Sequence, residues 1–323
     1  MSIVVTGSLA YDYIMRFPGA FKEHILPEKM DSLSVAFLVN TLERVRGGVA
    51  GNIAYNLALL GERPQLFGAV GQDFGDYRAW LDARGVDTSR LITIENEFTS
   101  SCFITTDEHN HQIVSFYPGA MSQNHTLSLR HLELTAKDMV LISASSPESM
   151  DNLARECQEL HIPYIFDPGK QTPRLEASVI RSGLKGARVL IGNDYEFGMM
   201  AKKLDMTEDD LIVSAPITVI TRAEHGSTIY LRGEDSSESY DYTATTIPAV
   251  NVAEVRDPTG AGDAYLAGLV FGIVHNLSWE ETGRIAALTA AYAVEHYGPQ
   301  EHAYSLADFG ARYQETFGKP FSI

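Results

Sequence analysis

A short turn in the last quarter of the chain has the composition of a phosphate-binding site. It is followed by the apolar stretch 264–271 and consists of small residues ending in an aspartate: Gly260, Ala261, Gly262 and Asp263. The apolar stretch predicts a buried helix, and the unpaired N–H groups at the start of a helix attract phosphate. Phosphate repels a carboxylate, so Asp263 needs a further role there. Removal of a proton from an attacking hydroxyl is such a role, and the turn therefore indicates the catalytic centre of a kinase.

A purely structural explanation of the two aspartates in this region stays open at this point. Asp257 can cap the turn, and Asp263 can simply stabilise the start of the helix, where negative charge is favourable. The local chemistry favours neither interpretation over the other.

A second glycine-rich segment, Gly47-Gly48, precedes a predicted helix and is a candidate site for a polyol. Paired glycines let a ligand approach the backbone closely, and Asn52 lies one turn into the helix, where its amide can reach back. Asp12 follows the first predicted strand, and a carboxylate accepts hydrogen bonds from two neighbouring hydroxyls at once. We predict that these residues hold the substrate, although a Gly-Gly pair alone is more often only a turn.

The composition excludes several classes of partner. The chain has 323 residues, 45% of them hydrophobic, which is enough to bury a full core. Its formal net charge of −17 argues against nucleic acid or an anionic membrane as the main partner, because either needs a basic surface. Two cysteines, Cys102 and Cys157, give no disulfide framework, and no apolar run of about 18 residues occurs. We expect a soluble, cytoplasmic protein that acts on small molecules.

Short apolar, β-branched runs alternate with helical patterns along the chain. This alternation predicts an α/β fold with a mainly parallel sheet and helices on both faces. The predicted strands are 3–6, 65–70, 139–143, 164–166, 189–191 and 217–221, and the predicted helices are 50–60, 77–84, 150–160 and 195–204.

Two segments, 13–45 and 98–118, interrupt the alternation and predict a small antiparallel lid. Residues 32–37 alternate like a half-exposed strand, and 98–117 contains two such runs around the polar turn 107–110. The turn contains metal-ligating residue types, but we interpret it as a solvated hairpin tip. A lid would exclude water, which keeps a kinase from hydrolysing its donor. The same segments could instead extend the main sheet or form a homodimer interface.

Three motifs together resemble those of the ribokinase-like (PfkB) family of sugar and nucleoside kinases. They are the segment 257–263, the glycine pair with Asn52, and the segment 193–196, so the resemblance spans nearly the whole chain. It implies one domain over residues 1–323, a three-layer α/β/α core with a β-sheet lid, ATP as the donor and Mg²⁺ as the obligatory ion. It also implies that Asp263 is the base and that Gly260, Ala261 and Gly262 form the anion hole.

The resemblance also implies where the nucleotide and the metal bind. Asn193 and Glu196 would hold Mg²⁺ through water, although the same spacing fits a helix capping box. The donor site would include Thr221, Arg222, Gly226 and Thr259, but Ala223 stands where many family members have glycine. Potassium activation is frequent in the family, and carbonyls near Asp257 and Thr259 could bind K⁺, but no local pattern requires it.

Several segments resemble bacterial adenosine kinases most closely within the family. Phe116 and Met121 flank a Pro-Gly turn and could stack against a purine, or could simply pack the lid onto the core. Gln171 could hydrogen-bond the edge of the base. We therefore predict an ATP-dependent adenosine kinase that makes AMP. The alternatives are a kinase for free ribose or fructose and a nucleoside-binding regulator without turnover.

Overall fold

An eight-stranded sheet forms the centre of the computed structural model, which describes residues 1–25, 31, 34–109, 111–233 and 241–321. The strand order is β14-β13-β12-β11-β10-β9-β1-β4, and only β13 and β14 run antiparallel to their neighbours. The sheet strands are β1 (Ile3–Thr6), β4 (Gln65–Leu66), β9 (Met139–Ser143), β10 (Tyr164–Asp167), β11 (Val189–Asn193), β12 (Ile217–Thr221), β13 (Ser227–Arg232) and β14 (Tyr242–Ile247).

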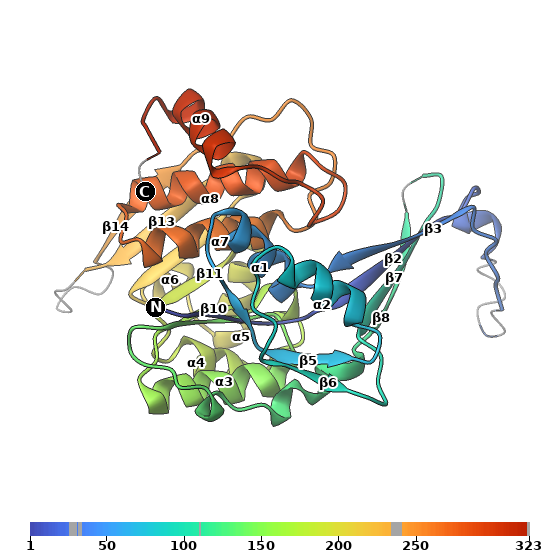
Figure 1. Ribbon diagram of the computed structural model, residues 1–323, viewed down its shortest axis with the longest axis horizontal. Coiled ribbons are helices and arrows are strands. Elements are labelled where there is room, and N and C mark those ends of the chain that lie inside the picture. Colours follow the sequence, from blue (N-terminus) through green and yellow to red (C-terminus); the bar gives the residue numbers. More distant parts are fainter. Residues whose placement is uncertain (26–30, 32–33, 110, 234–240, 322–323) are drawn as a thin grey trace.

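Helices cover both faces of this sheet (Figure 1), because alternate residues of its buried strands face opposite sides. Val5 packs on one face with α1 (Val49–Leu59), α2 (Gly75–Asp82), α7 (Ala261–Val274), α8 (Trp279–Val294) and α9 (Leu306–Phe317). Val4 packs on the other with α3 (Pro147–Leu160), α4 (Ala177–Leu184), α5 (Asp194–Leu204) and α6 (Glu208–Ile212). Within the described ranges, no helix has both the length and the apolar character needed to cross a membrane.

The core elements largely agree with the sequence prediction. The strands 3–6, 139–143 and 217–221 are confirmed with the same ends, and each predicted helix is present with its start shifted by one to three residues. The predicted strand 65–70 is wrong in one respect, because the chain leaves the main sheet after β4. It continues as β5 (Gly68–Gly71), which pairs with β6 (Leu91–Ile94) in a separate two-stranded sheet.

A four-stranded sheet projects from one side of the core as the lid (Figure 1). Its order is β3-β2-β7-β8, and the strands are β2 (Ala10–Arg16), β3 (Thr41–Gly47), β7 (Ser100–Thr106) and β8 (Gln112–Tyr117). The outer pairings are antiparallel, but β2 and β7 run parallel. The predicted strand 32–37 is wrong for residues 34–37, which form no strand, and residues 32 and 33 lie outside the described ranges. Phe37 instead packs against Phe17 and Phe21.

The hairpin tip between β7 and β8 is anchored by a buried carboxylate. Asp107 is 1% exposed, so its interpretation as a solvated residue is wrong. Its oxygens accept hydrogen bonds from the backbone N–H of Phe21 at 3.1 Å and from those of His109 and His111 at 2.9 Å. These bonds compensate for the burial of the charge and tie the hairpin to the segment that follows β2.

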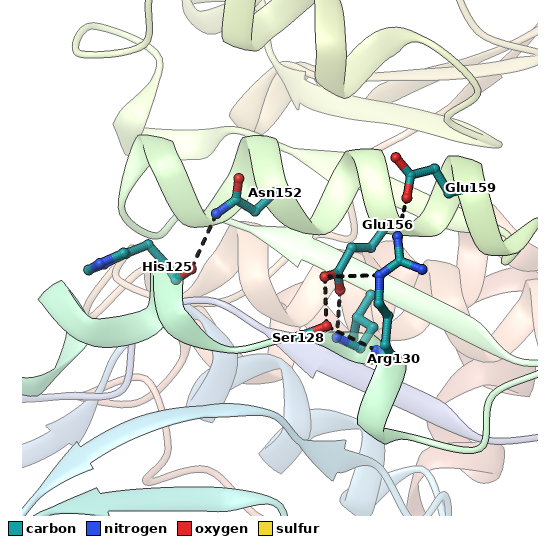
Figure 2. Close-up of polar contacts among 7 residues, drawn as sticks. His125, Ser128, Arg130, Asn152, Glu156 and Glu159 are labelled. Carbon is teal, nitrogen blue, oxygen red and sulfur yellow. Dashed lines mark hydrogen bonds and ion pairs between the residues drawn. The ribbon is translucent and has the colours of Figure 1, made fainter.

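The segment that follows the lid is fastened to helix α3 by side-chain contacts (Figure 2). Glu156 of α3 accepts hydrogen bonds from the Ser128 hydroxyl and the Leu129 N–H, both at 2.6 Å, and Glu159 pairs with Arg130. The Asn152 amide donates to the carbonyl oxygen of His125 at 3.2 Å. The short 3-10 helix Gly119–Thr126, which carries Met121, is thereby held in place beside the core.

Candidate active site

A cavity of about 580 Å³ opens at the carboxyl ends of the parallel strands, between the core and the lid. Its volume is in the range of small-molecule sites, and its position is the one expected for ligands of such sheets. Thirteen of the residues that the sequence analysis singled out line it: Asp12, Gly48, Asn52, Phe116, Met121, Gln171, Asn193, Glu196, Thr221, Thr259, Gly260, Gly262 and Asp263.

The start of helix α7 forms one wall of the cavity. Gly260 has a φ of 81°, and a side chain there would collide with Pro299, so the turn depends on glycine. The N–H of Ala261 donates to the Pro258 carbonyl at 3.2 Å, whereas those of Gly262 and Asp263 have no backbone acceptor among the described residues. A Cβ added to Gly262 would stand in open space. The helix start therefore offers free donors and room for an anion.

Asp257 caps this turn, as the structural interpretation predicts. One of its carboxylate oxygens accepts a hydrogen bond from the Thr259 N–H, and the other accepts one from the Gly298 N–H, both at 2.9 Å. Asp263 has a different environment, because its carboxylate lines the cavity. The two aspartates thus differ in surroundings although they flank the same turn.

The Asp263 carboxylate is held by the Asn52 amide. Asn52 Nδ2 donates to Asp263 Oδ2 at 2.7 Å, across 211 residues of sequence. Burial raises the pKa of Asp263 to about 6, although the Asn52 hydrogen bond and the Lys170 charge act in the opposite direction. A carboxylate with this pKa is ionised near neutral pH and is more basic than an exposed aspartate. Both properties suit a general base.

Asn52 lines the cavity, and the prediction that its amide holds a substrate hydroxyl stays a prediction. Each end of the amide also makes a hydrogen bond within the protein. Its Nδ2 donates to Asp263, and its Oδ1 accepts from Gln300 Nε2 at 2.7 Å. The side chain is only 4% exposed, so its contacts define the position of Asp263.

Asp12 also lines the cavity, near the start of lid strand β2. Burial raises its pKa to about 6, and the nearby Lys170 charge lowers it. A Cβ on Gly47 would lie 2.7 Å from Asp12 Oδ2, and one on Gly48 would lie 2.5 Å from the Ser8 carbonyl oxygen. The glycine pair therefore permits the close packing of β3 against β2, and Gly47 itself is buried beside the cavity.

Phe116, Met121 and Gln171 also line the cavity. The Phe116 side chain is 39% exposed, while Met121 is buried on the short helix that follows β8. Gln171 Oε1 is buried and has no hydrogen-bond partner among the described residues. An unpaired buried amide oxygen is unfavourable unless a ligand donates to it. The cavity lining therefore combines the apolar surface of Phe116 and Met121 with one unpaired acceptor, Gln171 Oε1, which suits a heteroaromatic ring.

Asn193 and Glu196 form a helix capping box at the start of α5 and also line the cavity. Glu196 Oε2 accepts from the Asn193 N–H at 2.9 Å, and Asn193 Oδ1 accepts from the Glu196 N–H at 2.8 Å. The second carboxylate oxygen of Glu196 has no partner among the described residues and is available to a cation. Within those residues no three His, Cys, Asp or Glu side chains could hold a metal directly. This donor set suits Mg²⁺, which keeps most of its water ligands.

The segment after β12 keeps its turn despite the missing glycine. Ala223 has a φ of 46°, in the left-handed region that glycine adopts readily, and Gly226 has a φ of 79°. Thr221 lines the cavity, but Arg222 does not. The Arg222 guanidinium donates to the Thr228 hydroxyl at 2.9 Å on β13. This contact occupies the side chain that the sequence analysis assigned to phosphate.

Several residues in and behind the cavity were not singled out by the sequence analysis, and four of them have notable contacts or charge. Asp167 and Lys170 line the cavity, and burial together with Glu196 and Asp263 raises the pKa of Asp167 well above its usual range. Tyr77 and Gln300 lie behind the cavity and contact Asn52 or its partner. Asp167 and Lys170 stand in a polar run after a predicted strand and could have been found by position. Nothing local marks Tyr77 or Gln300.

A doubly covered parallel sheet, a lid, and a basic carboxylate beside an open helix start define the class of α/β phosphotransferases. Comparison with known proteins places the chain within that class. The profile described as "pfkB family carbohydrate kinase" matches residues 2–305. The chain therefore belongs to the pfkB family of carbohydrate kinases.

Nucleoside kinases are among the proteins similar to this chain. The nucleoside kinase of Burkholderia thailandensis in complex with inosine is 35% identical, with a TM-score of 0.85 and 99% of each chain covered. A second structure of that enzyme is described as a complex with ADP-inosine. The nucleoside kinase of Methanocaldococcus jannaschii is 28% identical over 92% of each chain. The ribokinase of Bacillus subtilis is 25% identical over 93% of this chain and 94% of its own.

Proposed function

We propose that the protein is an ATP-dependent nucleoside kinase that transfers the γ-phosphate to the 5′-hydroxyl of a purine nucleoside, with adenosine as the predicted acceptor. The observation that carries the proposal is the pairing of a basic carboxylate, Asp263, with the free N–H groups at the start of α7. A hydroxyl placed between them can lose its proton to the carboxylate while the phosphate is bound by the amides.

In this proposal Asp263 Oδ1 or Oδ2 accepts the proton of the 5′-hydroxyl as its oxygen attacks phosphorus, and the bond to the leaving ADP oxygen breaks. The N–H groups of Gly262 and Asp263 stabilise the charge that develops on the transferred phosphoryl group. Lys170 lines the cavity, its charge lowers the pKa of both Asp12 and Asp263, and it adds positive potential there.

The donor would lie along the segment that includes Thr221, Gly226 and Thr259, close to the start of α7. Asn193 and Glu196 would hold Mg²⁺ through water, and this ion would supply positive charge to the donor phosphates. The assignment of Arg222 to the donor is not supported by its contact with Thr228. Activation by K⁺ through carbonyls near Asp257 and Thr259 stays a prediction.

Several features favour a nucleoside over a free sugar as the acceptor. Asp12 can accept two ribose hydroxyls beside Gly47 and Gly48, while Phe116 and Met121 supply apolar surface that a sugar alone would not need. The unpaired Gln171 oxygen can accept a hydrogen bond from the base, such as the 6-amino group of adenine. The inosine complex of the similar Burkholderia enzyme supports the same choice.

The test is a phosphorylation screen with ATP and Mg²⁺ over adenosine, inosine, ribose and fructose, with nucleotide products separated by chromatography. We expect rapid formation of AMP, turnover of inosine, and no phosphorylation of the free sugars. A higher kcat/KM for ribose or fructose would make the protein a sugar kinase. Stabilisation against heat by adenosine without any product would make it a nucleoside-binding regulator instead.

A further inference from the structure

A network of four hydrogen bonds runs from the end of lid strand β3 to the Asp263 carboxylate. Tyr77 of α2 donates its hydroxyl proton to the Gly47 carbonyl oxygen at 3.0 Å, where lid strand β3 ends. Gln300 Nε2 donates both to the Tyr77 hydroxyl oxygen and to Asn52 Oδ1, the latter at 2.7 Å. Asn52 Nδ2 then donates to Asp263 Oδ2 at 2.7 Å.

Both ends of this hydrogen-bond network only accept, the Gly47 carbonyl oxygen and the ionised Asp263 carboxylate, and the bonds between them have directions that suit both ends. A carbonyl oxygen only accepts, so the Tyr77 hydroxyl must donate to Gly47 and can only accept from Gln300. The Gln300 amide must therefore turn its NH₂ group toward Tyr77, and the second proton of that group points to Asn52. Asn52 must then present its oxygen to Gln300 and its NH₂ group to Asp263.

The residues of this hydrogen-bond network are buried in the core and have little freedom to rearrange. Tyr77, Gln300 and Asn52 are 0%, 2% and 4% exposed. A Cβ on Gly51 would lie 2.2 Å from the Tyr77 hydroxyl, so a glycine at that position in α1 is what lets the hydroxyl reach Gln300. The neighbouring Pro299 packs against Gly260, which places the same short segment behind both the amide donors and the base.

We propose that Tyr77 and Gln300 are positioning residues, which fix the Asn52 amide with its NH₂ group toward Asp263 and so keep this carboxylate oriented as a proton acceptor. The inference rests on the proposed function, since it assumes that Asp263 is the base. If Asn52 were free to turn its oxygen toward Asp263, the carboxyl group would be protonated to avoid repulsion, and a protonated carboxyl group cannot accept the hydroxyl proton.

Other charges around Asp263 do not supply this orientation. Lys170 faces it from the segment after β10, Glu196 from α5 and Asp167 from β10. These groups change the electrostatic potential at the Asp263 carboxylate. Among the described residues, Asn52 is the one that donates a hydrogen bond to that carboxylate. Gln300 and Tyr77 support the direction of that one bond from within the core.

The test compares Gln300→Leu and Tyr77→Phe with a matched control, Tyr55→Phe. Tyr55 also donates a buried hydroxyl to a backbone carbonyl, that of His302, but among the described residues it makes no side-chain hydrogen bond or ring contact with Tyr77, Gln300 or Asn52. For Gln300→Leu and Tyr77→Phe we expect kcat to fall about 10-fold or more, with the KM for the acceptor changed less than about threefold. The acidic limb of the pH profile of kcat should move to higher pH. Tyr55→Phe should lose stability without either effect.

Asp263→Asn, measured alone and combined with Gln300→Leu, separates this inference from the proposed function. If the two substitutions act on one step, the double variant is no slower than Asp263→Asn alone. Full turnover of Asp263→Asn would refute the assignment of the base. The positioning role would be refuted if Gln300→Leu and Tyr77→Phe both kept the kcat and the pH profile of the wild type. If Asp263→Asn lost turnover in the same experiment, the assignment of Asp263 as the base would still hold. Thermal unfolding of each variant shows that it is folded.

Discussion

At the scale of single residues, the proposed mechanism depends on one carboxylate that is more basic than usual and still ionised at neutral pH. Burial raises the pKa of Asp263 to about 6, while the Asn52 hydrogen bond and the Lys170 charge limit the rise. The result is a group that is ionised at neutral pH and still binds a proton more readily than an exposed aspartate. Asp257, a few residues away, is used instead as a cap for the turn.

The first prediction concerns this base. Asp263→Asn keeps the size of the side chain but removes the proton acceptor, so kcat should fall by roughly 10²-fold or more. The affinity for the nucleoside should stay within a few-fold, because the hydroxyl-binding groups at Asp12 are unchanged. Steady-state kinetics and equilibrium binding by calorimetry measure the two quantities separately. A variant with normal turnover would require a different base.

The candidate site was predictable from sequence wherever local pattern carries the chemistry. The helix start at Gly260 and the capping box at Asn193 follow from short-range rules, and the structure shows both. The contacts of Asn52 could not be derived, since its partners Asp263 and Gln300 lie 211 and 248 residues away. Nor does any local pattern reveal that Arg222 faces β13.

At the scale of elements, the strand register of the lid decides which side chains reach the cavity. Asp12 on β2 is paired with Cys102 on β7, which is paired with Phe116 on β8. All three line the cavity, so they form one row across three strands on the inner face of the lid. The neighbouring row contains Tyr13 and Phe103, whose rings stack with centroids 4.9 Å apart. Adjacent residues of a strand face opposite sides.

The second prediction uses these two rows as a matched pair. Phe116 and Phe103 are 39% and 40% exposed and lie on neighbouring strands, but only Phe116 lines the cavity. Loss of base stacking costs about 1–3 kcal/mol, so Phe116→Ala should raise the dissociation constant for adenosine roughly 5-fold to 150-fold. Phe103→Ala should change it less than about twofold. Equal effects of both substitutions would show that the lid contributes stability and does not provide a stacking surface for the purine ring.

The sequence predicted the core elements better than the lid for a physical reason. The core strands are apolar runs buried on both faces, which is a strong signal, and they were located almost to the residue. The lid strands are partly exposed and mixed in character, and β8 is exposed at every position. The alternating pattern around Phe37 belongs to an aromatic cluster and not to a strand. Use of the exposed lid face in a homodimer stays a prediction.

At the scale of the whole molecule, one buried histidine links stability to pH. His302 is fully buried, its Nε2 contacts Asn56 Oδ1 at 2.8 Å, and its Nδ1 has no partner among the described residues. Burial, with a contribution from His296, lowers the pKa of His302 from about 6.5 to about 4. The unfolded chain therefore binds a proton at this residue well above the pH at which the native protein does, and stability is lost as the pH falls between these values.

The third prediction follows from this difference. Between pH 7 and pH 5 the wild-type protein should lose about 2 kcal/mol more free energy of unfolding than His302→Gln does. Asp12 and Asp263 act in the opposite direction, because their raised pKa values favour the native state as the pH falls, but they are present in both proteins and cancel in the comparison. Urea denaturation of both proteins at the two pH values measures the effect. An equal loss of free energy of unfolding in the wild-type protein and in His302→Gln would show that His302 does not titrate in this way.

The long sequence separation between Asn52 and its partners has a consequence for synthesis on the ribosome. The glycine pair, the first sheet strand and the lid all precede residue 120, yet Gln300, which bonds to Asn52 and has the proposed positioning role, is synthesised near the end. A nascent chain can thus complete most of its sheet long before it has a competent centre. We therefore expect ribosome-bound nascent chains to be inactive until the segment around Gln300 has left the exit tunnel and can pack against Asn52.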